Sequence, residues 1–302
     1  MAILGSGAVG LYYGGRLAAA GEDVKFLVRG DFDSISRHGL EVKSIHGDFH
    51  LDAPQVYRTP SEIGPVDLVI VAWKATSNGQ LAAMLGPLLH ARTQVLTLQN
   101  GLGNCESLAE IVGPERVMGG LCFVCINRIA AGQVIHSGGG RVALGEWQQG
   151  ETGRAEELAR RFRLAKIEGI ATQNLQKSQW EKLVWNIPFN GLSVAEGGVT
   201  TDVLLAAPAN VALIREIMQE VIQAARGQGL DLADELIDSN IERTRPMGAY
   251  RTSSMIDFVE GREVEVEPIW GEPLRRARQC GVAVPQIEKL LHRIRVCMAE
   301  RG

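Results

Sequence analysis

The sequence has few cysteines, no long hydrophobic run and no excess of positive charge. Its five cysteines are scattered over 302 residues, which argues against a secreted disulfide framework and favours reduced thiols. The N-terminus has no basic region and no apolar stretch long enough for a signal peptide or membrane span, so we expect a cytoplasmic protein without a membrane partner. Lys and Arg total 31 against 35 Asp and Glu, a balance that argues against a nucleic-acid partner.

Patterns that bind metal ions are missing as well. Cys122 and Cys125 have CxxC spacing, but they lie in an apolar, strand-like run in which their side chains would not share a face. The 6 histidines show neither an HExxH motif nor a paired ligand spacing. We therefore expect no metal site.

The length and composition favour a globular protein of two domains. The chain exceeds the size of one ordinary hydrophobic core, and 45% hydrophobic with 22% charged residues is typical of a globular protein. In the first half, short apolar runs alternate with helix-like segments, which predicts an α/β domain of the Rossmann type with a doubly wound parallel sheet. The apolar runs cover residues 2–4, 24–28, 66–72 and 93–98.

The pattern changes after Gln173, where long stretches with helical spacing begin. We predict an α/β domain over residues 1–173 and an all-helical C-terminal domain over residues 174–302. Within the first domain, a serine and three glycines at 137–140 separate two strand-like runs, which predicts the turn of a β-hairpin.

A glycine-rich turn joins the first strand to the first helix. Its first glycine allows a tight turn, its second lets the backbone approach a pyrophosphate, and its third lets the helix pack on the strand. The phosphates then meet the N-terminus of a helix. The predicted dinucleotide-binding residues are Gly5, Ser6, Gly7, Ala8, Val9 and Gly10.

The residue after the second strand indicates which dinucleotide binds. An NAD site would usually have an acidic residue there to bind the ribose hydroxyls, whereas this sequence has Arg29. Lys25, four residues earlier, adds a second positive charge. A guanidinium pairs well with a 2′-phosphate, so we predict NADP(H) as the cofactor. The alternative is that Arg29 is a surface charge and that Asp31 binds the ribose.

Two polar residues follow later strands, at the edge of the sheet where α/β proteins bind their ligands. Lys74 offers a cation to a phosphate or carboxylate, and Asn100 offers an amide on a glycine-rich loop. We include both among the cofactor-binding residues; the alternative is that they cap the following helices.

In the helical half, Lys182, Asn186 and Asn190 recur every four residues and so share one face of a helix. Their neighbours are apolar, which indicates a buried helix whose polar groups need partners. A bound ligand would provide them; a polar seam between domains is the alternative.

These motifs, in order and spacing over the whole chain, resemble the ketopantoate reductase family. The segments that carry the resemblance are the Gly5–Gly10 turn, Trp73-Lys74-Ala75, Asn100-Gly101-Leu102-Gly103, Lys182 with Asn186 and Asn190, and Ser253-Ser254-Met255. The resemblance implies reduction of 2-dehydropantoate (ketopantoate) to (R)-pantoate with NADPH, a step of pantothenate and coenzyme A biosynthesis.

The resemblance also implies roles for single residues. Lys182 matches the family's proton-donating lysine, and Glu265 matches its glutamate beside the substrate, although Glu263 and Glu267 are close neighbours. The residues implied to bind the substrate are Asn186, Asn190 and Ser254.

The chain also departs from the family pattern. Pro268 and Trp270 follow Glu265 where the family more often has other residues, and Arg251 replaces a frequent polar amide. We include Arg251 among the substrate-binding residues. Because it suits a second carboxylate, a related reductase of another small 2-keto acid stays open.

Two further alternatives remain. One is a non-enzymatic NADP(H)-binding sensor, and the other is a two-domain dehydrogenase of the 6-phosphogluconate or glycerol-3-phosphate kind. The amphipathic stretch 286–299 suits either its own domain or a partner helix, which leaves a homodimer open.

Overall fold

The computed structural model of the protein describes residues 1–148 and 153–301, which form two compact units. The first unit comprises Met1–Gln99 and Asn104–Leu175, and the second comprises Asn100–Gly103 and Gln176–Gly302. The second thus takes four residues from the middle of the first half, which the sequence pattern did not predict. None of the described helices is both long enough and apolar enough to span a membrane.

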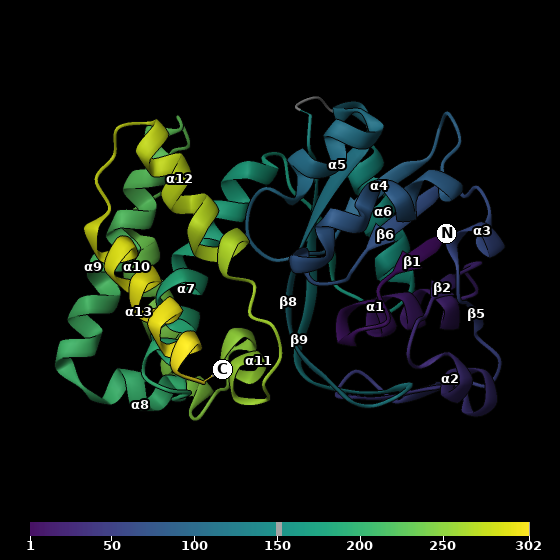
Figure 1. Ribbon diagram of the computed structural model, residues 1–302, viewed down its shortest axis with the longest axis horizontal. Helices are drawn as coiled ribbons and strands as arrows, with labels where there is room; N and C mark the ends of the chain where they lie inside the picture. Colours follow the sequence, from purple (N-terminus) through teal and green to yellow (C-terminus); the bar gives the residue numbers. More distant parts are fainter. Residues whose placement is uncertain (149–152, 302) are drawn as a thin grey trace. The chain divides into compact units, whose positions relative to one another are not determined.

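The first unit is built on a 10-stranded, mostly parallel sheet (Figure 1). Only the pairs β3–β4 and β8–β9 are antiparallel among the described strands. In spatial order the strands are β4 (Phe49–Leu51), β3 (Leu40–Ser44), β9 (Gln133–Glu146), β8 (Val117–Ala130), β7 (Gln94–Thr97), β6 (Leu68–Val71), β1 (Ala2–Leu4), β2 (Lys25–Leu27) and β5 (Gln55–Tyr57), with β10 (Gly169–Ala171) beside β9.

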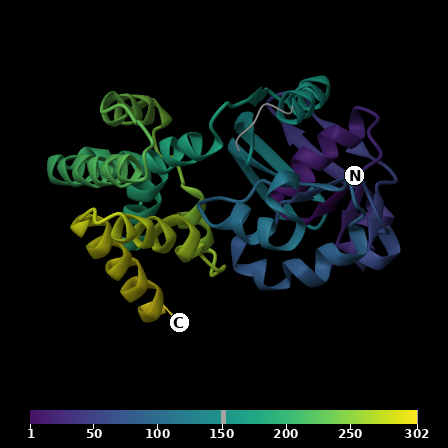
Figure 2. The same ribbon diagram turned by 90° about the horizontal axis from the view of Figure 1, so that it is seen from above.

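Helices cover both faces of this sheet (Figure 2). Alternate residues of each central strand enter opposite cores: Leu68 and Ile70 of β6 pack with α1 and α6, whereas Val69 and Val71 pack with α4 and α5. The predicted doubly wound Rossmann-type fold is confirmed. The helices are α1 (Ala8–Ala19), α2 (Phe32–His38), α3 (Pro60–Ile63), α4 (Leu81–Leu85), α5 (Asn104–Val112) and α6 (Arg154–Leu164).

The Ser-Gly-Gly-Gly segment at 137–140 does not form the predicted hairpin turn. The chain turns at Ala131 and Gly132, and the glycine cluster lies inside β9, where the ladder with β8 shifts its register. Gly139 and Gly140 have positive φ, as bulges often require. The prediction was wrong because glycine adopts positive φ both in β-bulges and in hairpin turns, so its presence alone does not distinguish the two.

The second unit is helical, as predicted. α9 contacts α8, α10, α12 and α13, and these helices share one hydrophobic core with α7. The helices are α7 (Leu175–Ala195), α8 (Thr201–Ala206), α9 (Pro208–Gly227), α10 (Glu235–Thr244), α11 (Ser253–Val259), α12 (Glu272–Gln279) and α13 (Pro285–Arg301), with a π-helix at Glu267–Gly271 before α12.

A buried histidine makes the stability of the first unit depend on pH. His136 of β9 is 1% exposed, and its Nδ1 lies 2.8 Å from Ser44 Oγ. Burial, and then the neighbouring His46, lower the pKa of His136 below its ordinary value of 6.5. On acidification the unfolded chain therefore takes up this proton before the folded chain does.

We expect the free energy of unfolding to keep its His136 contribution above pH 6.5 and to lose it as the pH falls through the lowered folded pKa. Urea unfolding at several pH values between neutrality and mild acid measures this slope. His136→Gln should flatten it, while His38→Gln, a substitution of an exposed histidine, should not. Equal slopes in all three proteins would contradict the assignment.

Candidate active site

The turn between β1 and α1 has the geometry of a dinucleotide cradle. Gly5 has φ +115°, and a Cβ there would lie 2.5 Å from Trp73 N. A Cβ on Gly10 would lie 1.9 Å from Gly5 O, so the fold itself excludes side chains at both positions. A Cβ on Gly7 would meet no protein atom within 4 Å. The protein's own packing therefore gives no reason for glycine at 7, whereas the approach of a ligand does.

The N-terminus of α1 is prepared for an anion. Gly7 is the N-cap of this helix, with no side-chain cap, and the first turn holds no acidic residue. The unpaired amides and the helix dipole at this end favour a negative group. These features and the open space at Gly7 fit the pyrophosphate of a dinucleotide.

Beyond β2, the two residues weighed for cofactor choice differ in their surroundings. Arg29 is exposed, and its Nη1 donates a 3.2 Å hydrogen bond to Gln80 Oε1. Asp31 forms an ion pair with Arg128, and its side chain is 15% exposed. Asp31 already has a cationic partner. This arrangement therefore favours Arg29 as the residue that would contact the 2′ substituent of the ribose.

The ends of β6 and β7 carry an amide network that the sequence analysis missed. Gln99 Nε2 donates to Asn78 Oδ1 at 2.7 Å, and Asn78 Nδ2 donates to Asn104 Oδ1 at 2.9 Å. Lys74 is half-buried at the N-cap of the 3-10 helix Ala75–Gln80, where it forms no side-chain cap. Amide side chains in the segments that follow two parallel strands were the available signal, since ligands bind at this edge.

The second unit brings Lys182 and Asn100 together. Lys182 Nζ, on α7, donates a 2.9 Å hydrogen bond to Asn100 Oδ1, although the two residues are 82 positions apart. Asn100 belongs to the second unit, so this bond lies within one compact body. Its amide therefore orients the ammonium group, a role not predicted for it.

The two asparagines of α7 differ in their partners. Asn190 is 1% exposed, and its Oδ1 accepts hydrogen bonds from Ser254 N at 3.0 Å and Ser253 Oγ at 3.3 Å. Asn186 is 8% exposed, and its side chain has no hydrogen-bond partner in the part of the chain that the structure describes. Its amide atoms are not among the fully buried side-chain atoms that lack a partner, so the amide remains accessible to water or to a ligand.

Burial separates the three neighbouring glutamates. Glu265 is 8% exposed and occupies the centre of a tight turn closed by a 2.9 Å bond from Val266 N to Val264 O. Glu263 is exposed, and Glu267 is exposed and paired with Arg295 at 2.8 Å. Of the three, Glu265 is therefore the best candidate for a buried carboxylate that contacts the substrate.

Arg251 lies in the segment before α11 and is exposed. Within residues 1–148 and 153–301 it forms no hydrogen bond or ion pair. The structure thus does not connect it to Lys182, Asn186 or Asn190.

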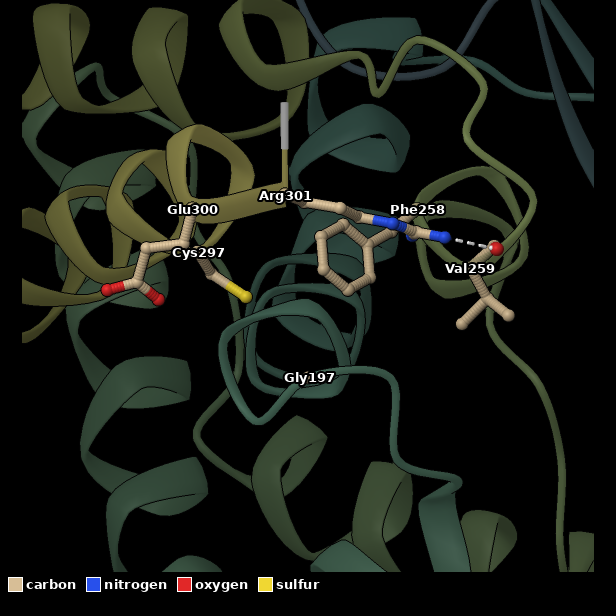
Figure 3. A pocket seen from close by; sticks show the side chains of 6 residues that line it. All are labelled: Gly197, Phe258, Val259, Cys297, Glu300 and Arg301. Atoms are coloured by element: carbon tan, nitrogen blue, oxygen red, sulfur yellow. Dashed lines mark hydrogen bonds between the residues drawn. The ribbon is translucent and has the colours of Figure 1, made fainter.

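No group of three or more His, Cys, Asp or Glu residues that could hold a metal ion occurs among the described residues. A hollow of about 350 Å³ lies at the end of α13, where Arg301 donates a hydrogen bond to the Val259 carbonyl (Figure 3). It contains none of the candidate residues. Its lining consists of Gly197, Phe258, Val259, Cys297, Glu300 and Arg301.

Two family models together match most of the chain. A family model described as "Ketopantoate reductase PanE/ApbA" matches residues 1–149, and its C-terminal counterpart matches residues 174–297. The chain belongs to the ketopantoate reductase family. It is accordingly a dinucleotide-binding oxidoreductase that acts on CH–OH groups.

Relatives cover the chain almost completely. The 2-dehydropantoate 2-reductase of Nostoc sp. is 40% identical over 299 residues, 97% of this chain and 93% of that protein. A crystal structure of 2-dehydropantoate 2-reductase from Geobacter metallireducens has TM-score 0.95 and 45% identity, covering 98% of this chain and 99% of that chain. The enzyme from Methylococcus capsulatus has TM-score 0.92 and 30% identity, covering 99% and 96%.

Two departures from the family pattern have structural roles. Trp270 is fully buried, and its Nε1 donates a 3.0 Å hydrogen bond to the Ile187 carbonyl of α7, next to Pro188. Pro268 O accepts a 2.8 Å bond from Leu102 N. Both residues thus tie the π-helix to elements that carry candidate site residues.

Proposed function

We propose that the chain reduces 2-dehydropantoate to (R)-pantoate with NADPH, in pantothenate and coenzyme A biosynthesis. The observation that carries the proposal is the 2.9 Å bond from Lys182 to Asn100, on a helix face that also presents Asn186 and Asn190. We expect this reaction in the cytoplasm, and a homodimer stays a prediction.

Lys182 is the proposed acid. When bound, NADPH supplies a hydride to the keto carbon. The ketone oxygen then gains negative charge, which an ammonium group within hydrogen-bond reach neutralises by giving up a proton. An ammonium has three donors, and the bond to Asn100 fixes one of them and so limits the rotation of Nζ. Glu265 is proposed to accept a hydrogen bond from a substrate hydroxyl and so to hold the substrate beside Lys182.

The remaining polar groups are proposed to hold the substrate. The oxygen of Asn190 is occupied by the start of α11, which leaves its NH₂ group as the donor to a substrate carboxylate or hydroxyl. Asn186 and the Ser254 hydroxyl have the same proposed role. Arg251 is proposed to attract the carboxylate from the exposed segment before α11. Substitution of any one of these should mostly raise KM.

Arg29 is proposed to select NADPH through the 2′-phosphate, with the rest of the cofactor held by the Gly5–Gly10 turn and Lys74. Loss of one charge-assisted hydrogen bond costs about 1.5–3 kcal/mol, so Arg29→Ala should raise KM for NADPH roughly 10-fold or more. KM for NADH should stay the same, because NADH lacks that phosphate.

Steady-state kinetics with both cofactors measures this difference. Arg37→Ala, which removes an exposed arginine from α2, is the control and should change neither constant. A wild-type preference for NADH, or an equal loss with both cofactors in Arg29→Ala, would contradict the assignment.

A related 2-keto acid is the second candidate substrate. It is favoured by Arg251, an exposed cation without an ion-pair partner among the described residues. A substrate with a second carboxylate would use that charge. Turnover of such an acid with a higher kcat/KM than ketopantoate, abolished by Arg251→Ala, would favour this candidate.

A further inference from the structure

The loop Asn100–Gly103 belongs to the second unit, although the chain on both sides of it belongs to the first. It lies between β7, a strand of the sheet in the first unit, and α5, a helix that packs on that sheet. A loop between such neighbours would ordinarily stay with them. Some interaction must therefore hold these four residues in the helical unit.

Leu102 provides that interaction. Its side chain is 3% exposed and is part of the hydrophobic core formed by α7, α9 and α13. Its backbone N donates a 2.8 Å bond to Pro268 O in the π-helix. Gly101 has φ +81°, and a Cβ there would lie 2.2 Å from Pro268 O, so the loop backbone lies directly on that segment.

This anchoring determines the position of Asn100. Asn100 is two residues before Leu102, and its Oδ1 accepts the hydrogen bond from Lys182 Nζ. A loop released from the core would be free to follow β7, and the amide would then leave the ammonium group.

We propose that Leu102 is a positioning residue for the reaction: its burial in the helical unit holds Asn100 against Lys182 and so orients the proton donor. This inference rests on the proposed function, because it assumes that Lys182 is the acid. Leu102 touches neither substrate nor cofactor in this account and acts through Asn100.

The first test is a double-mutant cycle in the full-length enzyme, with Leu232→Ala as the matched control. Leu232 is buried in the same core and lies in the segment between α9 and α10. Leu102→Ala should lower kcat about 10-fold or more, since small misplacements of reacting groups carry costs of this size. Both substitutions should lower the melting temperature by similar amounts, because each removes a buried leucine from the same core. In Leu232→Ala, however, kcat should stay within about 2-fold of wild type.

The cycle then asks whether Leu102 acts through Asn100. In the Asn100→Ala background, Leu102→Ala should add no further loss of kcat, because the amide it positions is already absent. The proposal would be overturned if the kcat losses of Leu102→Ala and Asn100→Ala multiplied in the double variant. It would also be overturned if Leu102→Ala and Leu232→Ala lowered kcat equally.

A second readout needs no turnover. In protein labelled with ¹³Cε-lysine, the Lys182 signal is assigned by its loss in Lys182→Ala. It should move to the same position in Leu102→Ala and Asn100→Ala and stay in place in Leu232→Ala. A signal that moves in Asn100→Ala alone, or in neither variant, would overturn the proposal. If the wild type does not reduce ketopantoate, the proposed function fails, and this comparison still decides the role of Leu102.

Discussion

Lys182→Ala is expected to lower kcat about 10²- to 10⁴-fold, the range that a positioned general acid contributes. The reason is that Lys182 Nζ, held by Asn100 Oδ1 at 2.9 Å, has no equivalent on its helix face, where the other polar side chains are amides and hydroxyls, which are much weaker acids than an ammonium group. The dissociation constant for NADPH should stay unchanged, because the cofactor cradle lies in the other unit.

Single-turnover kinetics and fluorescence titration of NADPH separate these two quantities. Lys289→Ala removes an exposed lysine from α13 and is the matched control, with wild-type kcat expected. A Lys182→Ala enzyme that keeps most of its kcat would remove the lysine from the mechanism. An enzyme that loses NADPH affinity in parallel would indicate a general structural defect.

Gly7→Val is expected to weaken NADPH binding while leaving the fold intact. A Cβ at Gly7 meets no protein atom within 4 Å, and its φ of −76° suits any residue. The added side chain would instead occupy the space of the pyrophosphate, so the dissociation constant should rise more than about 10-fold, or ~1.4 kcal/mol of binding free energy.

Gly10→Ala is the contrasting variant, because its Cβ would lie 1.9 Å from Gly5 O. It should lower the melting temperature strongly, whereas Gly7→Val should lower it only slightly, by the cost of a valine at a helix N-cap. Isothermal titration with NADPH and thermal unfolding of both variants give the comparison. Normal NADPH affinity in Gly7→Val would place the cofactor elsewhere.

Local features were the ones that the sequence predicted well. The glycine turn and the apolar strands depend on neighbouring residues, so the α/β half and the change to helices could be predicted from spacing alone. The glycine cluster at 137–140 was assigned wrongly because turn chemistry does not distinguish a hairpin end from a bulge.

Long-range contacts could not be predicted from the sequence. Which of three adjacent glutamates is buried depends on the packing around Glu265. The bond between Ser254 N and Asn190 Oδ1 joins residues 64 positions apart. The transfer of Asn100–Gly103 to the helical unit depends on a hydrophobic core that the loop itself does not reveal.

The most direct test of the central claim is the loss of NADPH absorbance when the purified protein is mixed with ketopantoate, measured beside a panel of other small 2-keto acids. We predict turnover with NADPH, a higher kcat/KM for ketopantoate than for any other acid of the panel, and loss of that activity in Lys182→Ala. Tight NADPH binding without turnover of any acid in the panel would contradict the account and would favour a cofactor-binding sensor.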